Sequence, residues 1–450
     1  MELAEKNLLF SSRQLRQLLI PLIIERMLAS LMGIVDTMMV SNVGAEAVAG
    51  VSCVDSINQL VIFLLTAMAA GGTIICAQYL GRRDRENAER AARQVVLAAT
   101  VTGLALMVLC LALRRPLLRL IFGRVEPGVM AAAETYFLIT SLSYPLLALS
   151  NAISALYRAA GNSRLPMLVS VGSNLVNIAG NALLMFRFGL GVAGAAAATT
   201  FAAALGAAVL VVLQRRPGGA LDLGPLFRIR PEWGVIWLVL SIGIPSGLEN
   251  AMFQLGKLVV QSTVSTLGTT AISANAIVTV LELMTAVPGQ AIGIGMVTVV
   301  GQCIGAGETE QAKYYIRKLT AWGALVLLVF NWVIYALTGA VTVLAGMDAA
   351  SAAMAKHTLL WISLVKPFLW PLAFLPVNGM RAAGDVRYAL FASAFSMWVF
   401  RVGLTTLLCR VLGVGLIGIW CGYFADWGVR SILFPLRYRS GKWLAHHVIE

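Results

Sequence analysis

The sequence has little charge for its length. Only 12% of its 450 residues are Asp, Glu, Lys or Arg and 59% are hydrophobic, whereas a soluble globular chain carries about 25% charged residues. This composition excludes an ordinary soluble protein. Apolar runs of about 20 residues, long enough for a helix to cross a bilayer, recur along the chain, and the alternating pattern of strands is absent. We therefore expect an all-α polytopic membrane protein.

Catalytic and nucleotide-binding patterns are also missing. The chain has three histidines, no G-x-S-x-G nucleophile motif and no G-x-x-x-x-G-K-[ST] phosphate-binding loop, and its six cysteines form no C-x-x-C pair. These absences argue against an enzyme and against a bound cofactor. No segment is large enough for an ATP-binding domain, so any active transport by this chain would draw its energy from an ion gradient.

Twelve apolar segments are present, and we expect each to form a transmembrane helix. They are 15–40, 47–80, 91–113, 129–155, 165–187, 191–213, 234–265, 271–303, 316–345, 352–378, 388–409 and 413–436. The termini and the even-numbered loops hold 22 Lys and Arg residues, and the odd-numbered loops hold 7. Basic loops stay in the cytoplasm, so we expect a cytoplasmic-membrane protein with both termini inside. The net charge of +13 then needs no nucleic acid to explain it.

The two halves of the chain resemble each other. "IPLIIER" (20–26) matches "IPSGLEN" (244–250) at an offset of 224, and "YRAAGNSR" (157–164) matches "MRAAGDVR" (380–387) at 223. Residues 214–233 form the long polar connection, so we expect an N-lobe at 1–213 and a C-lobe at 234–450. Six helices per half make the repeats parallel, and two such bundles around a central cavity are typical of an alternating-access transporter.

One carboxylate lies in an otherwise lipid-like stretch, "LMGIVDTMMVSN" (31–42). Placing ionised Asp36 at mid-bilayer costs about 2.5–3.5 kcal/mol on insertion scales, so we interpret it as functional. A solitary carboxylate in low dielectric can load and release a proton, and with neutral oxygens around it could hold Na⁺. The alternative is structural hydrogen bonding.

Segment 165–187 offers such oxygens. Asn174, Asn177 and Asn181 follow one another at i, i+3 and i+7, which places them on one helix face. Asn is costly in lipid, so we expect this face to point into the bundle. The stripe either orients the coupling ion or links helices by hydrogen bonds, which contribute about 0.6 kcal/mol each.

Other intramembrane acids are candidates for a substrate site or a second ion site. They are Glu25, Asp55, Glu249 and Glu282, and Asn174 is a further candidate for the same role. An internal ion-pair network is an equally good interpretation for the C-lobe acids, and snorkelling to the interface or pairing elsewhere is the favoured alternative for Glu25. Pro21 and Pro245 occupy matching positions in the two halves, and each removes a backbone hydrogen bond from its helix. We expect them to act as structural hinges.

Several motifs together resemble the multidrug and toxic compound extrusion (MATE) family. They are "IPLIIERMLASLMGIVDTMMVSNVGAEAVAG" (20–50), "AQYLGRRDRENA" (77–88), "LYRAAGNS" (156–163), "NIAGNALLMFRFGLGVAGAAAAT" (177–199) and "VVGQCIGAGETEQA" (299–312). The resemblance implies two six-helix lobes in a V around a central cavity, and exchange of a drug-like organic cation for H⁺ or Na⁺. It also implies an N-lobe ion site, composed of Asp36, Tyr136, Asn177, Asn181 and Thr199.

The resemblance also defines an alternative function. Some members of the family have a second Asp at the position of Asn181, which this chain lacks. The wider superfamily includes flippases for lipid-linked oligosaccharide or peptidoglycan precursors, whose cavities hold several cations. Arg26 and Arg401 in an open cleft would favour that function. Otherwise we expect small organic cations and membrane lipids as the partners of a monomer.

Overall fold

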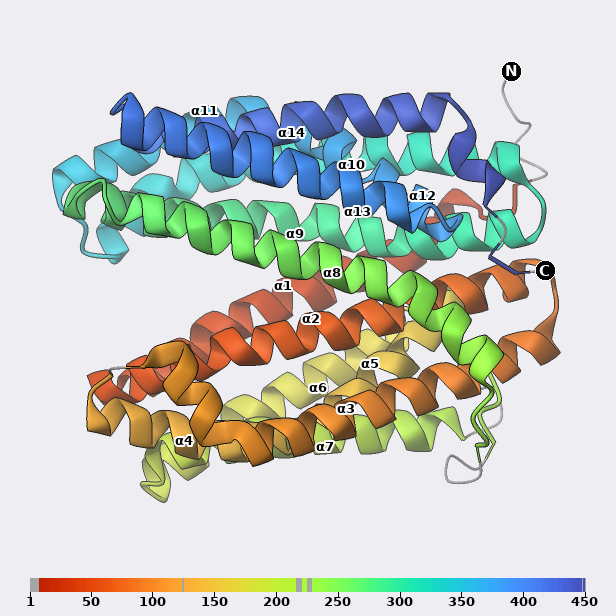
Figure 1. Ribbon diagram of the computed structural model, residues 1–450, viewed down its shortest axis with the longest axis horizontal. Helices are drawn as coiled ribbons and strands as arrows, with labels where there is room; N and C mark the ends of the chain where they lie inside the picture. The colour runs from red at the N-terminus through yellow and green to blue at the C-terminus, as the bar shows by residue number, and fades with distance from the viewer. Residues whose placement is uncertain (1–7, 124, 216–220, 225–228, 447, 450) are drawn as a thin grey trace. The chain divides into compact units, whose positions relative to one another are not determined.

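The computed structural model of the chain describes residues 8–449 except 124, 216–220, 225–228 and 447, and every regular element in them is helical (Figure 1). The elements of the first half are α1 (Ser12–Ser41), α2 (Ala45–Gly81), α3 (Arg85–Phe122), α4 (Pro127–Ser141), α5 (Tyr144–Ala159), α6 (Arg164–Asn181), the π-helical η2 (Ala182–Arg187) and α7 (Gly191–Gln214). Those of the second half are α8 (Trp233–Val264), α9 (Thr269–Gly305), α10 (Thr309–Leu344), α11 (Ala349–Phe374), α12 (Pro376–Ala382), α13 (Val386–Phe395), the π-helical η4 (Ser396–Leu404) and η5 (Leu407–Val411), α14 (Leu416–Arg439) and the 3₁₀-helical η6 (Lys442–Ala445).

Each of the twelve predicted segments lies in one helix or in consecutive helices, apart from up to three residues at a segment's ends. In the described part of the chain, 10 helices are long and apolar enough to cross a membrane. The number of spans is 11 if α4 and α5, which meet at a bend of 46°, are counted together as one span. The twelfth segment forms α14, which is 24 residues long. Its interior carries Asp426 and Arg430, both buried. Because of these charged residues, α14 is not among the helices counted as apolar enough to cross a membrane.

The helices form two compact units. The N-unit is Gln14–Gly247, and the C-unit is Leu248–Glu450 together with the N-terminal residues that end at Arg13. This division falls inside α8, two residues after Pro245, whereas the lobes at 1–213 and 234–450 with a linker at 214–233 stay a prediction. The reason for the division inside α8 is close packing, since a Cβ on Gly71 of α2 would lie 2.8 Å from the carbonyl oxygen of Val239 in α8. The first half of α8 thus belongs to the N-unit.

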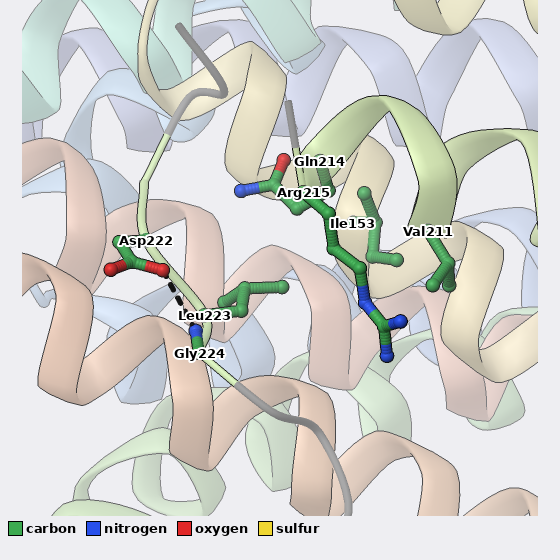
Figure 2. Close-up of a pocket in the computed structure, with 7 residues that line it drawn as sticks. All are labelled: Ile153, Val211, Gln214, Arg215, Asp222, Leu223 and Gly224. Atoms are coloured by element: carbon green, nitrogen blue, oxygen red, sulfur yellow. Dashed lines mark hydrogen bonds between the residues drawn. The ribbon is translucent and has the colours of Figure 1, made fainter. Parts of the chain in front are cut away.

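The described residues of the predicted linker pack against the N-unit, whereas 216–220 and 225–228 lie outside the described residues. Leu221 is fully buried, and the Gln214 side-chain amide donates to its carbonyl oxygen. Figure 2 shows the small cavity at this point, with the hydrogen bond from the Gly224 amide to Asp222. Its volume of about 20 Å³ is enough for about one water molecule, so it is no substrate site.

The sequence repeat is also present in the structure. Helices α2 and α9 both have 37 residues, and each follows a glycine with a positive φ, 141° at Gly44 and 87° at Gly268. Such φ values disfavour residues with a Cβ. The π-helical segments η2 and η5 also lie at corresponding positions. These turns begin and end matching helices in the two halves, although the break between α4 and α5 corresponds at the same offset to residues inside α11.

Small residues let the N-unit helices approach closely, as in other membrane bundles. A Cβ on Gly50 would lie 2.8 Å from Ala132 Cβ and 2.9 Å from the backbone oxygen of Val129 in α4. Similarly, a Cβ on Gly103 of α3 would lie 2.9 Å from the carbonyl oxygen of Tyr144. These contacts fix the spacing of helices that carry the site described below.

Gly50→Ala should destabilise the protein by about 1–3 kcal/mol, the range for overpacking a close contact, because α2 and α4 would have to separate. Gly172→Ala on α6 is the matched control, since a Cβ there meets nothing within 4 Å. Thermal unfolding in detergent measures both. Equal unfolding temperatures for the two variants would contradict the close packing.

Candidate functional site

The N-unit contains a cavity of about 260 Å³ between its helices, which we call the acidic cavity. Its polar lining residues are Asp36, Thr37, Ser52, Asp55, Asn58, Gln59, Tyr136, Thr140, Ser143, Tyr144, Asn181 and Thr199. None of the described residues that line it is Lys, Arg or His. Two carboxylates without a base make this cavity suited to a positively charged ligand.

A chain of hydrogen bonds connects α1, α6 and α7 at one side of the acidic cavity. The Asn181 side-chain amide donates to Asp36 Oδ1 over 2.8 Å and to Asn177 Oδ1 over 3.2 Å. The Asn177 amide donates to the Thr199 hydroxyl over 3.0 Å, and that hydroxyl donates to the Ala195 carbonyl. The structure thus brings together four of the five predicted ion-site residues in one network.

The local structure of α6 explains this arrangement. Asn177 and Asn181 are four residues apart, so both side chains lie on one helix face, and both are buried. The π-helix η2 begins directly after Asn181, and π-helical turns inside α-helices are frequent at functional sites. Tyr136, the fifth predicted residue, is buried on α4 and lines the same cavity.

A second acid shares the acidic cavity with Asp36. Asp55 on α2 has Asn58 and Tyr136 as side-chain hydrogen-bonding neighbours, and it interacts electrostatically with Asp36. The Asn58 oxygen in turn accepts a hydrogen bond of 2.7 Å from the Tyr144 hydroxyl. Two ionised carboxylates in one low-dielectric cavity repel each other, and a bound cation or proton relieves this repulsion.

The acidic cavity has free coordinating capacity. Neither Asp36 nor Asp55 forms an ion pair with a base in the described residues. The Asn181 side-chain oxygen is buried and has no hydrogen-bond partner there, which leaves it able to accept from a ligand or bind a small cation. The described residues contain no cluster of three His, Cys, Asp or Glu side chains that could hold a metal, so Na⁺ would need neutral oxygens of this kind.

Two of the other candidate acids lie in matching ion pairs outside the acidic cavity. Glu25 lies 3.7 Å from Arg158 in the N-unit, and Glu249 lies 2.6 Å from Arg381 in the C-unit. Both arginines come from the R-A-A-G turns of the repeat. The prediction that these acids form a substrate or second ion site is not favoured, because each carboxylate is matched by a guanidinium.

Glu282 and Asn174 also lie apart from the acidic cavity. Lys366 is fully buried and donates to Glu282 Oε1 over 2.6 Å and to the Thr285 hydroxyl over 2.6 Å. Asn174 is on the predicted α6 face but does not line the cavity, and its amide nitrogen makes no hydrogen bond among the described residues. The asparagine stripe therefore contributes two members to the site rather than three.

Sequence reasoning missed Asn58 and Tyr144 in the cavity, and Arg158 and Arg381 as ion-pair partners. Asn58 follows Asp55 by three residues on α2, and this spacing could have placed both on one face. The arginines lie in the repeated R-A-A-G motif, and their recurrence with the two glutamates was a usable signal. Tyr144 has no comparable signal, since it begins α5 after a bend.

The family model MatE matches residues 21–183 and 245–407, which together are more than half of the chain. The chain belongs to the MATE family. The two matches are related by the offset of 224 seen in the repeat. MATE proteins are membrane transporters, and the helical spans and the internal repeat agree with that assignment.

Alignments with individual relatives cover nearly the whole of this chain. The transporter YisQ of Bacillus subtilis is 28% identical over 94% of this chain and 93% of its own, and a probable multidrug resistance protein, NorM, of Thermotoga maritima is 27% identical over 96% and 93%. Among solved structures, a MATE transporter of Vibrio cholerae has a TM-score of 0.88 at 20% identity and covers 97% of this chain and 98% of its own. These likenesses show a shared fold over full length.

Glu249→Gln should destabilise the protein more than Glu25→Gln. The Arg381 Nη2 atom lies 2.6 Å from both Glu249 oxygens, whereas the Glu25 pair is 3.7 Å apart, so the first loss should be about 2 kcal/mol and the second under about 1 kcal/mol. Unfolding temperatures in detergent test this order. Loss of transport by correctly folded Glu249→Gln protein would show instead that the acid acts in the transport cycle.

Proposed function

We propose that this MATE transporter exports amphipathic organic cations in exchange for H⁺ or Na⁺ by alternating access. The observation that carries the proposal is the acidic cavity, which presents Asp36 and Asp55 and no basic lining residue. A cation is the ligand that such a cavity attracts, and its aromatic and apolar lining suits an amphipathic one. Several relatives, NorM of Thermotoga maritima among them, are named as probable multidrug resistance proteins, which supports this substrate class.

Asp36 is the proposed site of the coupling ion. Asn181 holds one carboxylate oxygen by its 2.8 Å hydrogen bond, and Asn177 and Thr199 fix the orientation of Asn181. Asp55 adds the second negative charge, which an organic cation would neutralise while Asp36 binds the ion. The two ligands are coupled because each reduces the negative charge that attracts the other, and this coupling is reciprocal.

The arrangement of the acidic cavity supports either H⁺ or Na⁺ as the proposed coupling ion. A proton can bind one of two carboxylates that repel each other, whereas Na⁺ can use the unpartnered Asn181 oxygen together with Asp36. No cofactor is needed in either case. We further propose a monomer in the cytoplasmic membrane with both termini inside, on the basis of the excess of Lys and Arg in the even-numbered loops.

Pro21 and Pro245 are the proposed hinges of the cycle. Both lie inside continuous helices, α1 and α8, where a proline weakens the backbone hydrogen-bond ladder. Pro245 is also two residues from the point where the chain passes from the N-unit to the C-unit. Bending at these residues would link occupancy of the acidic cavity to a change between two conformations.

The flippase alternative has less support. A cavity for a pyrophosphate-linked lipid would present arginines to an open cleft, but Arg401 is 2% exposed and its guanidinium contacts Asp426. The acidic cavity itself would repel such a substrate.

Asp36→Asn should abolish gradient-driven export while leaving expression and folding intact, because the amide cannot bind the coupling ion. Efflux of ethidium from proteoliposomes under an imposed pH gradient or Na⁺ gradient measures this. Asp348→Asn is the matched control, since Asp348 caps α11 and Asn caps helices equally well. Export by Asp36→Asn at the rate of the control would remove Asp36 from the mechanism.

Asn181→Ala should raise the ion concentration needed for half-maximal export about tenfold, which corresponds to the loss of one hydrogen bond to a charged group. The affinity for ethidium should change less, because the organic cation does not depend on this amide. Asn174→Ala is the control, since Asn174 lies outside the acidic cavity. Equal losses of ion and ethidium affinity would assign Asn181 a packing role only.

A further inference from the structure

The part of the C-unit that corresponds by the repeat to the acidic cavity differs from it in charged residues. At the repeat offset of 224, the cavity-lining positions Gly33, Asn58 and Thr199 correspond to Lys257, Glu282 and Tyr423. A base thus stands in the C-unit where the acidic cavity has a glycine, and an acid stands where it has an asparagine.

Three cations surround one aromatic ring at this place. The Phe253 ring centroid lies 5.0 Å from Lys257 Nζ, 4.8 Å from Arg401 Cζ and 5.7 Å from Arg430 Cζ. Each contact is within the range of a cation–π interaction. Three positive charges around a single ring also repel one another, so the arrangement requires negative charge nearby.

The carboxylates at this place are too few to balance the bases. Asp426 contacts both Arg401 and Arg430, and Glu282 is held by fully buried Lys366 at 2.6 Å. No carboxylate among the described residues forms an ion pair with Lys257, although Glu282 and Arg401 are its charged neighbours. We call this group the cationic cluster, which has four bases and two acids; its members are Lys257, Glu282, Lys366, Arg401, Asp426 and Arg430.

A second observation indicates a missing acceptor. The Arg401 Nε atom is buried and has no hydrogen-bond partner among the described residues, and the side chain is 2% exposed. Buried donors are normally satisfied. A guanidinium with a free donor, close to an ammonium with no ion pair, is a suitable receptor for an oxyanion.

We propose that the C-unit binds an oxyanion, a phosphate or carboxylate group, between Lys257 and Arg401. The anion would accept from Arg401 Nε and from the Lys257 ammonium, and would bring the net charge of the cationic cluster toward zero. Inorganic phosphate from solution and the headgroup of an anionic lipid share this chemistry. The site goes beyond the proposed export function, since binding here requires neither export nor Asp36.

The test is the unfolding temperature of the full-length protein in a neutral detergent, measured with increasing inorganic phosphate at constant ionic strength. Phosphatidylglycerol is added in a second series and phosphatidylcholine in a third. We expect a saturable rise of the unfolding temperature with phosphate or with phosphatidylglycerol, because a ligand that binds the folded state stabilises it. A response to phosphate identifies a soluble anion, and a response to phosphatidylglycerol alone identifies a lipid headgroup.

Lys257→Met should weaken the response about tenfold or more, whereas Lys356→Met, at an exposed position, should respond as the wild type does. Lys257→Gln replaces the first variant if that one does not fold. A flat wild-type response in both the phosphate and phosphatidylglycerol series would overturn the proposal. So would an undiminished response of the Lys257 variant.

Discussion

The candidate site depends on one interaction, the hydrogen bond from the Asn181 amide to the Asp36 carboxylate. This contact is 2.8 Å long and joins α1 to α6. It orients a carboxylate that no base of the described residues neutralises, inside a unit where Gly50 and Gly103 let helices pack closely. A carboxylate in this environment is costly unless a cation or a proton accompanies it. The chemistry of the acidic cavity follows from that requirement.

The repeat explains how one scaffold supports two different electrostatic environments. Helices α2 and α9 have the same length and the same glycine turns, and the pairs Glu25–Arg158 and Glu249–Arg381 recur in both units. These shared features are structural, because they set helix boundaries and tie the first helix of each half to its R-A-A-G turn. Within this shared frame, Gly33 of the acidic cavity corresponds to Lys257 of the cationic cluster at the offset of 224. Both proposed sites include positions at which the two halves carry different residues.

Much of the fold and part of the site could be predicted from the sequence. Hydrophobic runs give the helices because lipid cannot satisfy free backbone groups, and i, i+4 spacing places Asn177 and Asn181 on one face. The partner of Glu249 could not be derived this way, since Arg381 is 132 residues away and pairing depends on tertiary packing. The division of the compact units inside α8 could not be derived from the sequence either, because the first half of α8 packs against α2 and no composition change marks that contact.

The most direct test of the coupling is the exchange of ligands on the purified protein. Ethidium is added to wild-type protein in weakly buffered detergent solution, and the protons released are measured, together with the loss of bound radioactive sodium in a parallel sample. Binding of the organic cation to the acidic cavity should release one of the two ions, since both ligands respond to the same negative charge. Tight ethidium binding with release of neither ion would contradict the mechanism.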